Sequence, residues 1–167
     1  MQALGRLFDI CSGFVPVNMA TAANTGHRLH LRNYAGVAFV FFKGAGGAAE
    51  APTITVQEHT ANTGGTSRTL AAITEYYTKS EASLDGDETW TRVTQAAAGT
   101  ITNADWDDAN EVLLAFEVQA AALSADCAWI SANVADVGTT AQLGALLYLP
   151  YQLRYPQRPD GLAQPNA

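Results

Sequence analysis

The three histidines are the residues of this 167-residue chain best suited to acid–base or metal chemistry. His27 and His30 are three apart, and on a strand that spacing directs their side chains to opposite faces, which is poor geometry for a metal. His59 is distant in sequence. No serine or cysteine nucleophile with an orienting third group stands beside His27 or His30. We therefore expect exposed strand or loop histidines, no catalytic residues, no cofactor and no enzymatic activity.

Two groups of carboxylates could supply oxygen ligands to a hard cation such as calcium. They are Asp85, Asp87 and Glu88, and Asp105, Asp107 and Asp108. Neither spacing matches the twelve-residue calcium loop, and aspartate favours turns in any case. Solvated turn acids are the favoured interpretation and no metal site is predicted. A carbohydrate- or calcium-binding β-sandwich, with Trp106 and the second group as its site, is kept as an alternative.

Two further motifs carry little chemistry. The glycine-rich residues 44–49 follow an apolar run and loosely match a dinucleotide-binding loop, but Pro52 and a strand-like run follow where that loop needs a helix. An interstrand loop is the better interpretation. Cys11 and Cys127 lie far apart and match no metal-ligand spacing. A disulfide between them is left open.

Aromatic residues suggest contacts with other chains. Trp106 follows an acidic residue in a loop, where it either anchors a partner or folds back to cap the domain. Tyr148, Tyr151 and Tyr155 lie in an aromatic, proline-punctuated C-terminal stretch. Tyrosine is frequent at interfaces because it offers apolar area and a polar tip. The other interpretation is a last strand that packs on its own domain.

Period-two alternation dominates the elements that must position these residues. Residues 53–59 alternate cleanly, and residues 111–120 place Val112, Leu114, Phe116 and Val118 on one face. Residues 37–42 are apolar on both faces and predict a central strand. About eight or nine short strands with closely spaced turn residues predict an all-β, single-domain β-sandwich of jelly-roll type. We expect the core to contain residues 37–42, Val112, Leu114, Phe116 and Val118, together with Ile54 and Val56.

The expected boundaries leave short terminal arms. Residues 1–13 form an N-terminal arm or short helix, with Leu4, Leu7 and Phe8 on one face. Residues 14–155 form the β-sandwich domain. Residues 156–167 are rich in Pro, Gly, Gln and Asn and form a C-terminal tail.

Composition disfavours several classes of partner. The net charge of −7 and the pI near 4.7 argue against direct binding to nucleic acid or to an anionic membrane surface. No apolar stretch approaches the ~20 residues of a membrane span, and the N-terminus does not resemble a signal peptide. Only 15% of residues are charged, against a typical ~25%. Such a surface tolerates close contact with neighbouring chains.

Several segments resemble a family of small virion proteins of tailed bacteriophages, and the resemblance covers roughly residues 14–157. They are Val15-Pro16-Val17, Ala22-Ala23-Asn24-Thr25-Gly26, Leu31-Arg32-Asn33-Tyr34-Ala35-Gly36-Val37, Pro52-Thr53-Ile54-Thr55-Val56-Gln57-Glu58, Tyr77-Thr78-Lys79, Thr91-Arg92-Val93-Thr94-Gln95-Ala96, residues 134–144 and Tyr155-Pro156-Gln157. The resemblance implies a head-associated structural protein, above all a capsid decoration (cement) protein. It supplies no catalytic residues.

The resemblance leads us to expect a protein that is assembled in the host cytoplasm, binds the outer capsid surface of the virion and stabilises the shell. Its partner is the major capsid protein, and a homo-oligomer, first of all a cyclic trimer, is expected. A head–tail connector or tail structural protein is the alternative. The expected contact residues are Leu4, Leu7, Phe8, Trp106, Tyr148, Tyr151 and Tyr155.

Overall fold

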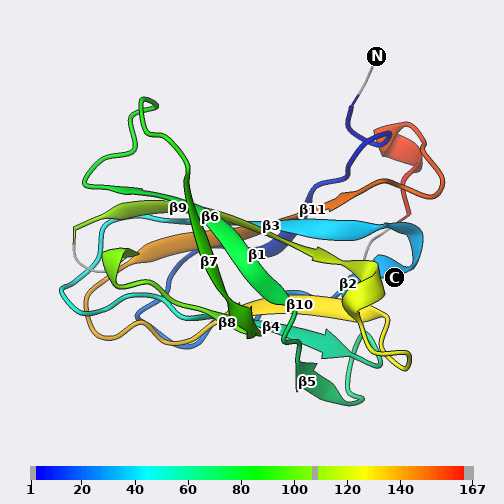
Figure 1. Cartoon of the computed structure of the whole chain (residues 1–167), viewed down its shortest axis with the longest axis horizontal. Coiled ribbons are helices and arrows are strands. Elements are labelled where there is room, and N and C mark those ends of the chain that lie inside the picture. The colour runs from blue at the N-terminus through cyan, green and yellow to red at the C-terminus, as the bar shows by residue number, and fades with distance from the viewer. Residues whose placement is uncertain (1–2, 107–108, 164–167) are drawn as a thin grey trace.

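A computed structural model describes residues 3–106 and 109–163 as two antiparallel β-sheets stacked face to face (Figure 1). The described residues contain short 3-10 turns and no α-helix. Among the described residues, no helix is long and apolar enough to cross a membrane. The all-β sandwich predicted from alternation is confirmed.

The two sheets differ in size. The larger has six strands in the order β1 (Cys11–Asn18), β11 (Leu143–Tyr151), β3 (Gly36–Lys43), β9 (Glu111–Gln119), β6 (Ile73–Glu81) and β7 (Thr91–Ala98). The smaller has the order β2 (Leu29–His30), β10 (Trp129–Val134), β4 (Ile54–His59) and β5 (Ser67–Thr69), and β8 (Thr100–Ile101) also pairs with β4. The 3-10 turns are η1 (Leu31–Asn33), η2 (Ala104–Trp106), η3 (Ala120–Ala122) and η4 (Pro159–Gly161).

Strand pairing follows the jelly-roll pattern. β1 pairs with β11, β2 with β10, β3 with β9 and β4 with β8, as in one long hairpin rolled up so that its strands alternate between two sheets. β5, β6 and β7 are inserted between the fourth and fifth strands of this roll, and the β6–β7 hairpin widens the larger sheet beyond β9. The predicted jelly-roll type is therefore observed.

The core fills the space between the sheets. Val112, Leu114, Phe116 and Val118 are all buried on the inner face of β9. Phe39 of β3 stacks on Phe116 at 4.8 Å between ring centroids. The alternating residues of β4, Ile54 and Val56, face them from the other sheet and are fully buried. These core predictions are confirmed, because alternation directs every second side chain inward.

The chain enters the sandwich earlier than expected. β1 begins at Cys11, three residues before the predicted domain, and residues 3–8 form a turn with isolated bridges. Of the two possibilities for this segment, a short helix is not what the structure contains. Leu4 bridges to Phe8, and Phe8 bridges to Tyr151 at the end of β11.

Candidate interaction surface

The outward side of the larger sheet is apolar at its centre. Strand register places Leu147, Val40, Ala115 and Tyr77 in one row across β11, β3, β9 and β6. The next row contains Ala145, Phe42 and Leu113, and Lys79 of β6 stands at its end. We leave this lysine out of the apolar set. Antiparallel sheets that face water usually carry polar side chains on that side. We call these seven residues the outer apolar face.

The larger members of this face remain exposed. Phe42 is 47% exposed, Leu147 42% and Tyr77 38%. In Figure 1 the smaller sheet covers one side of the larger sheet, and no second layer of described residues lies over the other. Fully burying one such side chain is worth about 1.5–3 kcal/mol, so completing the burial of a half-exposed one is worth roughly half of that. These neighbouring exposed apolar side chains make the face a candidate interaction surface.

A groove of about 650 Å³ adjoins the outer apolar face. It is lined by Ala38 and Ala115, among other small residues, and by Tyr77, Glu75 and Glu117. Alanine side chains leave the hollow because they do not reach above the backbone of the sheet. The groove therefore accepts side chains from a neighbouring surface that lies on the sheet.

The two terminal segments pair with each other, where the sequence suggested separate arms. The Gln157 amide donates to the Gly5 carbonyl at 2.9 Å, and the Asp9 amide donates to the Pro150 carbonyl at 2.8 Å. Figure 1 shows the first and last segments side by side near the end of β11. Gly5 has a φ of +79°, and a Cβ there would meet the Gln157 carbonyl oxygen at 2.5 Å, so this pairing requires glycine.

The predicted contact residues of these segments divide by exposure. Leu7 is 62% exposed and Tyr155 63%, so both are available to a partner. Leu4, Phe8 and Tyr151 are half-buried, with Phe8 and Tyr151 joined by the bridge between the segments. Residues 1–2 and 164–167 of the predicted arm and tail lie outside the described residues.

The prediction of Tyr148 as a contact residue is wrong. Tyr148 is 1% exposed, and its ring meets Phe39 edge-on at 5.0 Å between centroids. Its hydroxyl oxygen accepts a hydrogen bond from the Ala132 amide at 3.1 Å. Burial raises the pKa of Tyr148. The alternation of β11 turns Leu146 and Tyr148 inward and Leu147 outward, so the interpretation as a strand that packs on its own domain is correct here.

Trp106 is also unavailable to a partner. It ends η2 and is fully buried, and its indole Nε1 donates to the Thr78 hydroxyl at 3.0 Å. Tyr76 lies edge-on to it at 5.6 Å. The interpretation that Trp106 folds back to cap the domain is confirmed. A buried indole offers no stacking surface to a sugar, so the carbohydrate alternative loses its predicted platform.

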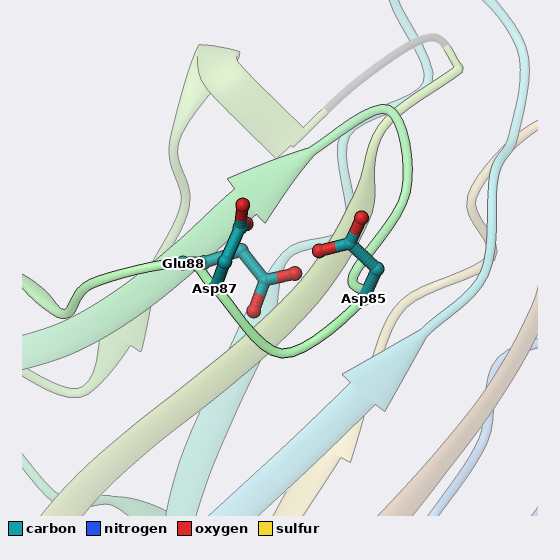
Figure 2. Close-up of side chains that lie close together, drawn as sticks. All are labelled: Asp85, Asp87 and Glu88. Atoms are coloured by element: carbon teal, nitrogen blue, oxygen red, sulfur yellow. The ribbon is translucent and has the colours of Figure 1, made fainter.

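The two acidic groups have different outcomes. Asp107 and Asp108 lie outside the described residues. Asp105, the third member of that group, is described, and its backbone carbonyl accepts hydrogen bonds from the side chains of Ser80 and Asn110. The carboxylates of the other group, Asp85, Asp87 and Glu88, lie within 4.8 Å of one another in the β6–β7 loop, as Figure 2 shows.

Within the group of Asp85, Asp87 and Glu88, the contacts of Glu88 are with its own loop and with the adjoining strand β6. The Glu88 carboxylate accepts from the Gly86 amide at 3.1 Å and lies 4.0 Å from the Lys79 ammonium. Asp85 and Asp87 are exposed. Three carboxylates from one turn supply only part of the six to eight oxygens that calcium takes.

Sequence reasoning missed a buried histidine. His59 is 2% exposed, with Nδ1 2.8 Å from the Ser67 hydroxyl and Nε2 2.9 Å from the Ser131 hydroxyl. Burial, aided by the charge of Arg28, lowers the pKa of His59 to about 4. Ser131 is 1% exposed, whereas Ser67 lies in the exposed strand β5. The expectation of an exposed histidine holds only for His27, since His30 is half-buried and stacks on Trp129.

A charged network beside His59 joins β4 to the loop that follows η3. The Glu58 carboxylate accepts from the Ser124 amide at 2.7 Å and from Arg68 at 3.2 Å. Burial raises the pKa of Glu58, but its hydrogen bonds and the charge of Arg68 outweigh burial and leave the pKa lowered. Arg68 also contacts Asp126 and Cys127. Both cysteines are free, so the disulfide left open by the sequence is not formed.

No family model, curated protein or solved structure matches this chain.

Proposed function

We propose that this chain is a structural virion protein that binds the outer surface of a tailed-phage capsid through its outer apolar face and stabilises the shell. The observation that carries the proposal is the group of half-exposed side chains of Val40, Phe42 and Leu147 on two neighbouring strands at the centre of a six-stranded sheet. The resemblance noted in the sequence gives the class of particle. The exposed apolar side chains of the sheet support the choice of contact surface.

Covering the outer apolar face requires little free energy of desolvation. Ala115, Leu113 and Ala145 bring no charge to its centre, and the charged side chains of Lys79 and Glu117 lie at its border. A partner that covers the centre alone removes little hydration from ions. The jelly roll holds the face rigid, which limits the entropy lost on binding. Modest contacts repeated by the symmetry of a shell add up, because each bound copy raises the effective concentration of further contacts.

The partner in this proposal is the major capsid protein. A head–tail connector or tail protein would use the same face at another position in the particle, and the face does not distinguish these positions. An electron-microscopy map of the particle does. Density for this sandwich on the shell exterior supports the proposal, and density confined to the connector or tail supports the alternative.

The binding test uses shells of the encoding phage that lack this protein. We expect the full chain to co-sediment with the shells, and we expect Phe42→Lys or Leu147→Lys to weaken binding at least about tenfold, because a charge would then be buried against the shell. The control is Thr63→Lys, which adds the same charge at an exposed loop position away from the outer apolar face.

Circular dichroism on each variant shows whether it is folded. If folded Phe42→Lys and Leu147→Lys proteins bind as tightly as Thr63→Lys, the outer apolar face is not the contact surface. Leu7 and Tyr155 are then the next residues to replace. If the unaltered chain does not bind shells and is absent from purified particles, the proposed function itself is wrong.

A further inference from the structure

His59 joins two serines on the outward side of the smaller sheet. It lies on β4 directly opposite Ser67 of β5, and its Nδ1 is 2.8 Å from the Ser67 hydroxyl oxygen. On the other side, its Nε2 is 2.9 Å from the Ser131 hydroxyl oxygen of β10. Ile130 and Ala132, the neighbours of Ser131, are fully buried in the core, so alternation turns Ser131 away from it.

The exposed end of this arrangement is a hydroxyl beside a positive charge. Ser67 is exposed, as is all of β5, whereas His59 is 2% exposed. Nη2 of the Arg28 guanidinium donates to the Ser67 hydroxyl oxygen at 3.1 Å. Nη1 of the same group donates to the Ala61 and Gly64 carbonyls at 2.7 Å, which holds it in place. A reagent in solvent can therefore reach the hydroxyl, which lies between a fixed cation and a buried imidazole.

We propose that Ser67 is a nucleophile that attacks carboxylic esters, with His59 as its general base and Ser131 as the residue that positions the imidazole. A hydroxyl that bonds a base oriented by a third group is the arrangement that activates serine. In this proposal Ser67 donates to Nδ1 of His59, and Nε2 carries the ring proton and donates to Ser131. The three residues come from three strands, so their sequence spacing did not reveal them. The inference does not depend on the proposed function.

The proposed reaction has two halves. Ser67 Oγ bonds to the ester carbonyl carbon while His59 Nδ1 takes the hydroxyl proton, and the carbonyl oxygen becomes an anion that the Arg28 charge stabilises. The anion collapses, the alcohol leaves with the proton from His59, and the acyl group stays on Ser67 Oγ. Water then attacks the acyl carbon and His59 takes a proton from it. That proton returns to Ser67 Oγ as the carboxylic acid leaves.

The charges around His59 keep its imidazole neutral. Burial and the charge of Arg28 lower the pKa of His59 to about 4, and the charge of Glu58 acts in the opposite direction. Arg68 of β5 is paired with Glu58. His30 of β2 stacks on the tryptophan that separates it from His59 in the sheet. The imidazole can therefore accept a proton at neutral and at mildly acidic pH.

The low basicity of His59 also decides the class of substrate. A weak base removes the serine proton only as the new bond forms, so the carbonyl carbon must itself be electrophilic. This condition favours esters over amides.

The test is incubation of the folded, full-length chain with p-nitrophenyl acetate, followed by peptide mass spectrometry. We expect Ser67 to be acetylated at least about tenfold faster than in the urea-unfolded chain, where the imidazole is no longer beside it. Ser67→Ala should lower the release of p-nitrophenolate. Ser12→Ala, which removes an exposed serine of β1, is the matched control and should leave the release unchanged.

The roles of the other two residues have their own readouts. The rate of Ser67 acetylation should stay level from pH 8 to 5.5 and fall toward pH 4. His59→Asn should slow it at least about tenfold, and circular dichroism shows whether that variant is folded. Nitrogen NMR of the imidazole should place the His59 ring proton on Nε2. Ser131→Ala should let the proton move to Nδ1 and slow the acetylation, which a merely structural role for Ser131 would not do.

Four results would each overturn the inference. They are acetylation of Ser67 no faster in the folded than in the unfolded chain, an unchanged rate in folded His59→Asn, a rate that falls between pH 7.5 and 6 as for an ordinary histidine, and a ring proton on Nδ1 in the unaltered chain. The pH profile and the NMR spectrum need no variant, so they decide the matter even if His59→Asn does not fold.

Discussion

Three buried polar side chains hold together parts of the chain that are distant in sequence. His59 links β5 to β10 through two serine hydroxyls, Glu58 links Arg68 to the loop after η3, and Trp106 bonds Thr78 in β6. Each has a partner for its buried polar atoms, which is the condition for burying them at low cost. These bonds give the sandwich specific long-range contacts beyond its apolar core.

The first prediction at the scale of single residues concerns pH and His59. The folded pKa of His59 is about 4 and the ordinary value is 6.5, so the unfolded chain binds the proton more readily between these values. Stability contributed by neutral His59 is therefore present above pH 6.5 and is lost as pH falls toward 4. The loss is roughly 3 kcal/mol at most.

Urea denaturation at pH 7, 5.5 and 4.5 measures this effect. His59→Asn should reduce the fall in unfolding free energy between pH 7 and 4.5, whereas His27→Asn, at an exposed position, should leave it unchanged. Equal pH dependence in the unaltered chain and both variants would show that His59 titrates normally.

The second prediction at this scale concerns Trp106. Trp106→Ala should lower the unfolding free energy by about 3–5 kcal/mol, because it leaves a cavity under η2 and an unpartnered Thr78 hydroxyl. Trp90→Ala, which removes a half-exposed indole, should cost less than about 1 kcal/mol. Chemical denaturation followed by circular dichroism distinguishes the two. Similar costs would mean that Trp106 is not a core residue in solution.

At the scale of elements, close backbone approaches position the loops. The turn before β2 crosses β10 at Gly26, whose amide donates to the Asn133 side chain at 3.0 Å. A Cβ on Gly26 would lie 2.3 Å from both the Ala132 carbonyl oxygen and the Tyr148 hydroxyl. The turn therefore lies directly against the strand, and only glycine fits.

Gly26→Ala should consequently destabilise the protein by about 1–3 kcal/mol or more, since backbone atoms of β10 must move. Gly44→Ala is the control, because its Cβ would meet only the Leu143 carbonyl oxygen at an ordinary 3.8 Å. Thermal unfolding midpoints measure both. A Gly26→Ala protein as stable as Gly44→Ala would contradict the close approach.

Strands with long alternation were predicted correctly from the sequence, and a strand with irregular alternation was not. Residues 111–120 and 53–59 alternate over many positions, so β9, β4 and their core side chains were predictable. The pattern of β6 is less regular, with Ile73, Tyr76 and Thr78 buried, and its pairing with β9 and β7 makes it a strand.

The candidate site was less predictable than the strands. Residues 37–42 were expected to be central because they are apolar on both faces, and β3 is central within its sheet, yet Phe42 and Val40 face outward with no second layer over them. Sequence shows that both sides of a strand are apolar but not whether both are covered. For both Tyr148 and Trp106 the sequence offered a partner contact and a packed position, and the packed position is the one observed.

At the scale of the whole molecule, the ends of the described chain meet. Gly5 bonds Gln157, and the Gln152 amide donates to the Leu7 carbonyl at 2.9 Å. The β6–β7 hairpin, by contrast, lies outside the eight-strand roll, and Gly86 at its tip has no atom within 4 Å of its would-be Cβ. These two features define where the chain can be joined and where it can be cut.

We expect a circular permutant that starts at Asp87, ends at Gly86 and joins the natural ends by a short Gly/Ser linker to keep the fold. Cuts in exposed loops are tolerated when the natural ends lie close together. Its circular dichroism spectrum should match that of the unaltered chain, with an unfolding free energy within about 2 kcal/mol. A permutant opened inside β3, between Phe39 and Val40, is the control and should not fold.

The pairing of β1 with β11 also decides how the molecule bears mechanical load. Cys11 lies opposite Tyr148, so both strands have their chain ends at the same end of the sheet. Force applied between the two ends separates these strands like a zipper, one hydrogen bond at a time, starting at Gly5 and Gln157. Force applied across the outer apolar face is shared by β11, β3 and β9 together. The paired ends are therefore the part of the fold that opens first under load.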